Sequence, residues 1–314
     1  MEYYAQVIDA NINRVAEGLR VIEEYTRFIS KNKALTDALA AMRKQLNLSE
    51  TNPINNLKIR DTFSDMRAKE VPSQRPELWD LLKANFKRVE EGLRVLEEYT
   101  GNPLYNSLRY DAYELEKEVL LSLTKKNIKP GIYLISDQIE ILEEGLKKGV
   151  SLIQLRDKKS DKPSLLSRSQ HMQALAKGYN TPFIINDHLD IALEIDADGF
   201  HSGQDDLSVT IQRRLLGPHK IIGKTTHNLE QGLQAQQDGA DYVSVGPIWE
   251  TPSKPGRAGI GFEYLKQASQ LRIPFVAIGG VSLDNIDQIL PYQPPLIGVI
   301  RAFDQLEILL ARIS

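Results

Sequence analysis

The sequence contains no cysteine among its 314 residues. This absence excludes disulfide bonds, thiol catalysis and thiolate metal sites together. The chain also lacks any apolar run of about 18 residues, so no membrane-spanning helix is predicted. The N-terminal segment carries Asp9 where a signal peptide would need apolar residues. We therefore expect a cytoplasmic protein that has no membrane partner.

Neither sign of charge dominates the composition. The chain has 39 Lys and Arg against 42 Asp and Glu, which gives a formal net charge of -3. This balance does not indicate a surface for nucleic acid or an anionic membrane, so neither partner is predicted. Any bound anion must therefore meet local Lys, Arg and backbone N–H groups. The length allows one large domain or two ordinary ones.

The first ~125 residues have helical patterning and contain an internal repeat. Residues 11–26 (NINRVAEGLRVIEEYT) and 85–100 (NFKRVEEGLRVLEEYT) differ at only four of 16 positions, at an offset of 74. Each copy carries a mid-helix glycine, Gly18 or Gly92, where glycine costs about 1 kcal/mol relative to alanine. We expect two equivalent helices packed about a pseudo-twofold axis, with each glycine permitting close helix approach or access of a ligand to the backbone.

From about residue 130 the pattern changes to short β-rich segments that alternate with helical segments. Such alternation indicates a parallel sheet with right-handed crossovers, and eight strands favour a closed barrel over an open sheet. The expected fold is therefore α/β: a (β/α)₈ TIM barrel in residues 128–314, preceded by an all-α helical domain in residues 1–127. The strand candidates are residues 131–136, 151–156, 182–187, 199–203, 220–226, 241–247, 274–280 and 296–302.

Polar residues follow nearly every strand candidate, at the end where barrels of this type build their sites. Arg156, Lys158 and Lys254 are three cations that could converge on phosphate. Gly279 and Gly280 would let backbone N–H groups approach a second phosphate. Each cation alone has an ordinary explanation as a solvated charge. The joint pattern at consecutive strand ends is what favours a phosphate site.

Two carboxylates among these strand-end residues suit a metal ion. Asp187 and Asp206 are hard oxygen ligands, and Mg²⁺ typically takes one or two carboxylates plus phosphate oxygens. Asp187 alone could equally cap a helix, and none of the five histidines has the spacing of a zinc site. Two phosphorylated ends plus Mg²⁺ indicate transfer from a diphosphate, in which the metal and the cations stabilise the departing pyrophosphate.

Seven motifs then carry a resemblance to a known family. Between residues 131 and 303 the chain contains, in order, YLISD, QLRDK, INDHLDIAL, ADGFHSGQDDL, IIGKTTHN, GADYVSVGPIWETPSKPG and VAIGGV. This segment resembles thiamine phosphate synthase throughout. The resemblance implies a Mg²⁺-dependent transferase that joins 4-amino-5-hydroxymethyl-2-methylpyrimidine diphosphate to 4-methyl-5-(2-phosphoethyl)thiazole. It implies a dissociative reaction in which pyrophosphate leaves, a pyrimidine methyl cation forms and the thiazole nitrogen captures it.

The resemblance also implies a role for individual residues. Lys254 and Arg156 would stabilise the diphosphate without any side-chain nucleophile, and Asp187 and Asp206 would be the Mg²⁺ ligands. The implied pyrimidine diphosphate contacts are Gln154, Arg156, Lys158, Asn186, Thr225 and Lys254, and the implied thiazole phosphate contacts are Thr251, Ser253, Gly280, Ile300 and Arg301.

Three positions depart from the family pattern. His188 stands where arginine is common, and Ser202 replaces a usual leucine. Residues 293–296, from Gln293 to Leu296, replace a Gly-Ala-x-Gly stretch before the last strand. This last change could reshape the start of the eighth strand and hence the phosphate cup.

The N-terminal domain resembles a helical domain fused to this synthase in cyanobacterial-type enzymes, through NINRVAEGLRVIEEYTRF, IRDTFSDM and the second repeat copy. A related stand-alone family is similar to a hydroxymethylpyrimidine phosphate kinase, which would give Arg60, Asp61 and Asp65 a Mg-phosphate role. The alternative is a scaffold or dimerisation bundle in which these residues form surface ion pairs. No glycine-rich P-loop is present.

Alternatives also remain for the barrel. It could be a thiazole tautomerase-like relative, or a non-catalytic regulatory barrel that binds ligand without turnover. The joint presence of Asp187, Asp206 and Lys254 argues against the tautomerase. Homo-oligomerisation is left open by the sequence.

Overall fold

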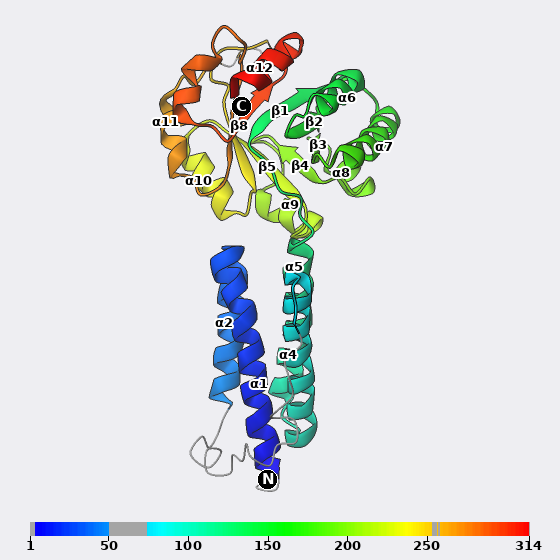
Figure 1. The fold of residues 1–314 in the computed structure, drawn as a ribbon, viewed down its shortest axis with the longest axis vertical. Helices are drawn as coiled ribbons and strands as arrows, with labels where there is room; N and C mark the ends of the chain where they lie inside the picture. The colour runs from blue at the N-terminus through cyan, green and yellow to red at the C-terminus, as the bar shows by residue number, and fades with distance from the viewer. Residues whose placement is uncertain (1–3, 50–73, 253–255, 257, 314) are drawn as a thin grey trace. The chain divides into compact units, whose positions relative to one another are not determined.

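The computed structural model describes residues 4–49, 74–252, 256 and 258–313 (Figure 1). The chain divides into two compact units, Met1–Thr124 and Lys125–Ser314. The described part of the first unit is helical, and the second unit contains a barrel. Arg60, Asp61 and Asp65, which were candidates for a phosphate role, lie outside the described residues.

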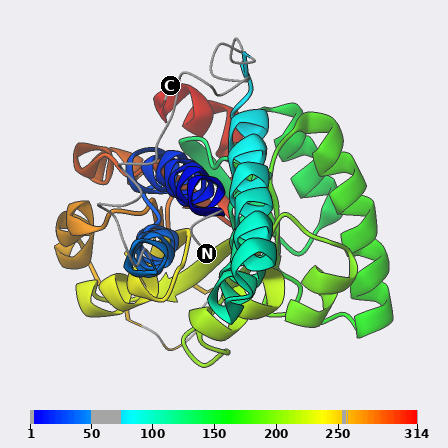
Figure 2. The ribbon, with the colours of Figure 1, turned by 90° about the horizontal axis from the view of Figure 1, so that it is seen from below.

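Long helices make up the described part of the first unit (Figures 1 and 2). Helix α1 packs against both α2 and α4, and α4 packs against α5. Their ends follow local chemistry: the Asn32 side chain caps α2, and Gly101 ends α4 in the left-handed conformation that favours glycine. The elements are α1 (Ala5–Glu24) with its π-helical continuation (Tyr25–Ile29), α2 (Lys33–Leu48), α4 (Leu78–Thr100) and α5 (Pro103–Ser122).

The two repeat copies lie on α1 and α4, and their glycines form the crossing. A Cβ added to Gly18 would lie 2.9 Å from Val89 Cγ2, and one added to Gly92 would lie 2.6 Å from Val15 Cγ2. Val15 and Val89 are themselves equivalent at the offset of 74, so each copy makes the same contact with the other. The expected pseudo-twofold pairing is confirmed, and the glycines serve close helix approach.

The second unit is a closed barrel of eight parallel strands in sequential order, β1 to β8. Every predicted strand is present, and the predicted fold class is confirmed. The strands are β1 (Gly131–Ser136), β2 (Leu152–Leu155), β3 (Phe183–Asn186), β4 (Gly199–Ser202), β5 (Ile221–Thr226), β6 (Tyr242–Val245), β7 (Phe275–Ile278) and β8 (Leu296–Val299).

Helices cover the outside of the barrel. Short 3₁₀ turns (Ile286–Gln288 and Leu290–Tyr292) lie between β7 and β8, and another (Ala302–Gln305) precedes the last helix. None of the described helices is both long and apolar enough to cross a membrane. The α-helices are α6 (Ile139–Lys147), α7 (Lys162–Tyr179), α8 (Leu189–Glu194), α9 (Val209–Leu216), α10 (Leu229–Gln237), α11 (Glu263–Gln267) and α12 (Leu306–Ile313).

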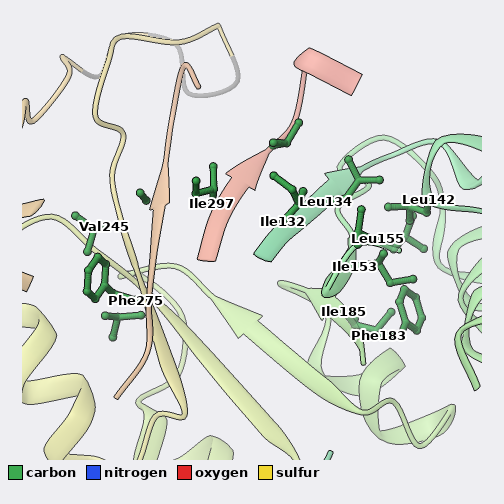
Figure 3. Close-up of a cluster of buried hydrophobic side chains, with 14 of the residues drawn as sticks. Ile132, Leu134, Leu142, Ile153, Leu155, Phe183, Ile185, Val245, Phe275 and Ile297 are labelled. Atoms are coloured by element: carbon green, nitrogen blue, oxygen red, sulfur yellow. The ribbon is translucent and has the colours of Figure 1, made fainter. Parts of the chain in front are cut away.

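Alternation along each strand separates two apolar layers. Side chains such as Ile132 and Leu134 of β1 belong to the outer layer, which packs against the helices (Figure 3). Tyr133 and Ile135 of the same strand belong to an inner cluster that fills the barrel. Inward positions near the C-terminal ends of the strands are therefore the ones available to line a site.

The substituted stretch Gln293 to Leu296 does not interrupt the barrel. Strand β8 pairs with β1 over its whole length and with β7 from Leu296 to Gly298, and Gly131 N donates to Pro295 O. The stretch lies at the N-terminal end of β8, whereas Ile300 and Arg301 follow the C-terminal end. The change is therefore separated from the proposed phosphate contacts by the length of the strand.

Candidate functional site

A cavity lies inside the barrel at the C-terminal ends of its strands. Its wall combines polar side chains on or just after β2, β3, β4, β5 and β6 with apolar groups and glycine on or just after β1, β7 and β8. The residues that line it include Gln154, Arg156, Lys158, Asn186, Asp187, His201, Thr225, Ser244, Thr251, Ile278, Gly279 and Ile300.

Asp187 sits in a tight turn at the end of β3. Its backbone has φ 61°, and His188 N donates to Asn186 O across it at 2.7 Å. A side chain in this left-handed region is uncommon, although aspartate tolerates it better than most residues. The turn places the carboxylate in the cavity wall, where Lys158 Nζ lies 3.2 Å from its Oδ2.

Asp157 holds the loop that carries Arg156 and Lys158. Its carboxylate accepts hydrogen bonds from the Ser160 hydroxyl and from the N–H groups of Lys159 and Ser160, and it pairs with Arg168. Burial pushes the pKa of this carboxyl upward. The hydrogen bonds and the Arg168 charge outweigh burial and hold the pKa of Asp157 far below its usual range. The loop is therefore anchored by an ionised carboxylate.

A second cavity adjoins the first on the side of β7 and β8. Thr251, Gly279 and Ile300 line both cavities, while Gly280 and Arg301 line only the second. Gly279 and Gly280 have φ 100° and 77°, and a Cβ on Gly279 would lie 2.4 Å from Pro247 Cα. Both positions therefore require glycine, which leaves the backbone accessible to a bound anion.

The Asp206 carboxylate lies at the end of β4 rather than in the wall of the first cavity. Its Oδ2 accepts a hydrogen bond from Gly203 N at 2.7 Å, and Gly203 itself lines that cavity. On the outer side, Lys224 Nζ donates to Gly203 O. Burial lowers the pKa of Lys224, and the neighbouring Asp206 and Asp205 charges oppose this effect. Lys224 thus holds the loop that presents Asp206.

The structure brings together most of the residues chosen from the sequence. Gln154, Arg156, Lys158, Asn186, Asp187 and Thr225 share the first cavity, and Thr251, Gly280, Ile300 and Arg301 line the second. Asp206 borders the first cavity through Gly203. Ser253 and Lys254 lie outside the described residues. Their assigned roles stay predictions.

Sequence reasoning overlooked the floor of the cavity. Tyr133 and Tyr242 are buried inside the barrel below Gln154 and Thr225, and His201 lies between Tyr242 and Thr225. The sequence offered one signal for this floor: β1 and β6 each carry a tyrosine at an inward position, where an apolar residue would be expected. Ser202, which replaces a usual leucine of the family, faces away from the cavity, where its hydroxyl accepts a hydrogen bond from the buried Gln212 Nε2 at 2.9 Å.

Two family comparisons match separate parts of the chain. Residues 129–303 match the family described as thiamine monophosphate synthase, and residues 6–118 match the ThiD2 family. Most of the chain also aligns with proteins named thiamine-phosphate synthase. Identity is 39% with the protein of Thermosynechococcus vestitus, covering 95% of this chain and 89% of the relative. It is 37% with that of Synechocystis sp., covering 95% and 91%.

The barrel is also similar to solved structures. One of them is the thiamine phosphate pyrophosphorylase from Pyrococcus furiosus, with a TM-score of 0.53 and 29% sequence identity. The match covers 61% of this chain and 98% of that one.

Proposed function

The chain belongs to the thiamine monophosphate synthase family, and we propose that its barrel joins a pyrimidine diphosphate to a thiazole phosphate. The substrates are 4-amino-5-hydroxymethyl-2-methylpyrimidine diphosphate and 4-methyl-5-(2-phosphoethyl)thiazole. The products are thiamine phosphate and pyrophosphate. The observation that carries this proposal is the pair of adjoining cavities. One is lined by Arg156 and Lys158, and the other by the glycines that follow β7.

The reaction needs no side-chain nucleophile. The bond between the pyrimidine methylene carbon and the diphosphate oxygen breaks, and its electron pair leaves with pyrophosphate. The thiazole nitrogen then supplies the pair for the new C–N bond. Arg156, Lys158 and Lys254 stabilise the charge that develops on the leaving group. Thr251 and Ile300, shared by the two cavities, hold the substrates where the nitrogen faces the methylene carbon.

Asp187 and Asp206 would hold a Mg²⁺ ion. One carboxylate lines the first cavity and the other is fixed at its border by Gly203 N. No group of three or more His, Cys, Asp or Glu side chains suited to a metal occurs in the described residues. Two carboxylates fit Mg²⁺, which completes its shell with phosphate oxygens and water. When bound, the ion would supply positive charge that stabilises the leaving pyrophosphate.

Measuring products from both substrates with Mg²⁺ separates this function from its alternatives. A transferase releases pyrophosphate and forms thiamine phosphate. A tautomerase-like relative would isomerise the thiazole without releasing pyrophosphate, and a regulatory barrel would bind ligand without turnover. Binding without pyrophosphate would overturn the transferase proposal.

The helical unit acts as a kinase that converts the pyrimidine monophosphate to the diphosphate. The match to the ThiD2 family supports this activity, because the related stand-alone proteins resemble such a kinase. The two functions then divide the chain into residues 1–127 and 128–314, and the product of one is the substrate of the other. A scaffold or dimerisation bundle is the competing function.

The kinase proposal is tested with the full chain, ATP and the pyrimidine monophosphate, followed by ³¹P NMR. ADP and the diphosphate should accumulate together. Diphosphate-dependent turnover by the barrel, without any ADP formation, would leave the helical unit as a scaffold. The proposed cytoplasmic location is tested separately by fractionation of the source cells.

A further inference from the structure

Five buried side chains form one continuous row of hydrogen bonds across the interior of the barrel. Gln154 Nε2 donates to Tyr133 Oη at 2.6 Å, and Tyr133 Oη lies 2.7 Å from Tyr242 Oη. His201 continues the row, with Nδ1 3.0 Å from Tyr242 Oη and Nε2 3.0 Å from Thr225 Oγ1. The row therefore begins and ends on residues that line the first cavity.

The interior of the barrel is shaped to hold this row. None of the five residues is more than 7% exposed. A Cβ on Gly223 would lie 2.1 Å from Tyr242 Cζ and 2.5 Å from His201 Nδ1, so only glycine leaves room for them. The His201 ring stacks on Tyr242 at an interplanar angle of 24°. Burial raises the pKa of both tyrosines, so both phenols keep their protons at neutral pH.

The direction of the row follows from counting its protons. Gln154 donates to Tyr133, so the Tyr133 proton is directed to Tyr242, and the Tyr242 proton is directed to His201 Nδ1. A neutral imidazole that accepts at Nδ1 carries its proton on Nε2 and donates it to Thr225 Oγ1. The Thr225 hydroxyl is then left with a proton to donate into the cavity. Because its Nε2 is engaged below, Gln154 presents its carbonyl oxygen as an acceptor.

We propose that Tyr133, Tyr242 and His201 are positioning residues that couple Gln154 to Thr225, so that the cavity floor selects an aminopyrimidine ring. This inference rests on the proposed function. An amino group adjacent to a ring nitrogen offers one donor beside one acceptor. That pattern complements an acceptor at Gln154 and a donor at Thr225. Reversing one end requires reversing every hydrogen bond in the row, and this is the source of the selectivity.

An oxo analogue of the substrate tests this coupling. Replacing the 4-amino group by a carbonyl turns the donor into an acceptor and gives the adjacent ring nitrogen a proton. The intact row should reject this reversed pattern. A broken row lets Gln154 and Thr225 reorient independently, so the preference for the amino substrate should fall.

The experiment compares Tyr242→Phe with Tyr264→Phe as its matched control. Tyr264 is also a buried tyrosine, with its hydroxyl 2.7 Å from Thr226 Oγ1, but it belongs to the outer layer and not to the row. Steady-state kinetics give the KM of each substrate and the ratio of kcat/KM for amino and oxo pyrimidine diphosphates. Tyr133→Phe breaks the row at its next link and replaces Tyr242→Phe if that variant does not fold.

The row predicts that Tyr242→Phe raises the pyrimidine KM about tenfold and lowers the amino-to-oxo preference about tenfold, the effect of one lost hydrogen bond. The thiazole KM should stay within about twofold, and Tyr264→Phe should leave all three quantities unchanged. An unchanged amino-to-oxo preference in Tyr242→Phe, or an equal rise in the KM of the pyrimidine and of the thiazole, would overturn the coupling but not the proposed function. Failure of the unaltered protein to use the amino substrate would overturn the proposed function as well.

Discussion

Substituting Gly92 by alanine tests the contact at the centre of the helical repeat. The added Cβ would lie 2.6 Å from Val15 Cγ2, closer than carbon atoms approach in well-packed proteins. Overpacking costs about 1–3 kcal/mol, and a contact this short belongs to the upper half of that range, about 2–3 kcal/mol. Alanine recovers about 1 kcal/mol of helix propensity. We therefore expect Gly92→Ala to lower the free energy of unfolding of the helical unit by about 1–2 kcal/mol.

The two tryptophans allow each unit to be followed separately. Trp79 lies on α4 and Trp249 lies in the barrel, so urea unfolding in a Trp249→Phe background reports on the helical unit. The control is Gly178→Ala on α7, where an added Cβ meets nothing within 4 Å. That change, read from Trp249 in a Trp79→Phe background, should stabilise the barrel by up to about 1 kcal/mol.

Removing the opposing methyl groups identifies the cause. By itself, Val15→Ala should lower the free energy of unfolding, but it also removes the methyl group that the Cβ added by Gly92→Ala would meet. The double variant Val15→Ala/Gly92→Ala should therefore lose about 1 kcal/mol less stability than the sum of the two single variants. Strict additivity, or a Gly92→Ala protein as stable as the unaltered one, would refute the close packing of α1 on α4.

Three further predictions concern single carboxylates. The pKa of Asp157 is lowered, so its contribution to the stability of the barrel is present above pH about 4 and is lost as the pH falls below this value. Asp157→Asn should therefore make the stability of the barrel depend less on pH in acid. If both proteins lose stability with falling pH at the same rate, as followed by Trp249 fluorescence, Asp157 does not anchor its loop through an ionised carboxylate. Burial raises the pKa of Glu90, so its contribution to the stability of the helical unit is lost as the pH rises through that raised value. Glu90→Ala introduces the residue found at the equivalent position of the first repeat, Ala16, and should weaken this pH dependence in unfolding followed by Trp79. An unchanged pH dependence would show that Glu90 is not its source. Asp187→Asn should lower kcat/KM by roughly 10²-fold, whereas the exposed neighbour Asp190→Asn should not, and equal rates for the two variants would remove Asp187 from the site.

Periodicity was enough to predict the barrel and the helical repeat. Each predicted strand is present because a strand buried on both faces appears in the sequence as a short, nearly continuous apolar run. Gly18 and Gly92 predicted a close helix crossing, because the unfavourable helix propensity of glycine must be offset by packing. The strand ends led to Gln154, Asn186 and Thr225 because the C-terminal ends of parallel strands meet at one rim.

Other features depend on contacts that span long stretches of chain. Tyr133 and Tyr242 are 109 residues apart, and no local pattern shows that their hydroxyls meet. The left-handed backbone of Asp187 likewise arises from the turn it makes, since aspartate is compatible with several conformations. Asp206 was chosen because it follows a predicted strand, but the hydrogen bond that it accepts from Gly203 N depends on the fold of the loop after β4.

The central claim is tested most directly by ³¹P NMR of the purified chain with Mg²⁺, the pyrimidine diphosphate and the thiazole phosphate. One pyrophosphate should appear for each thiamine phosphate formed, and both signals should be lost in Asp187→Ala. Binding of both substrates without pyrophosphate release, or unchanged release by Asp187→Ala, would contradict the account.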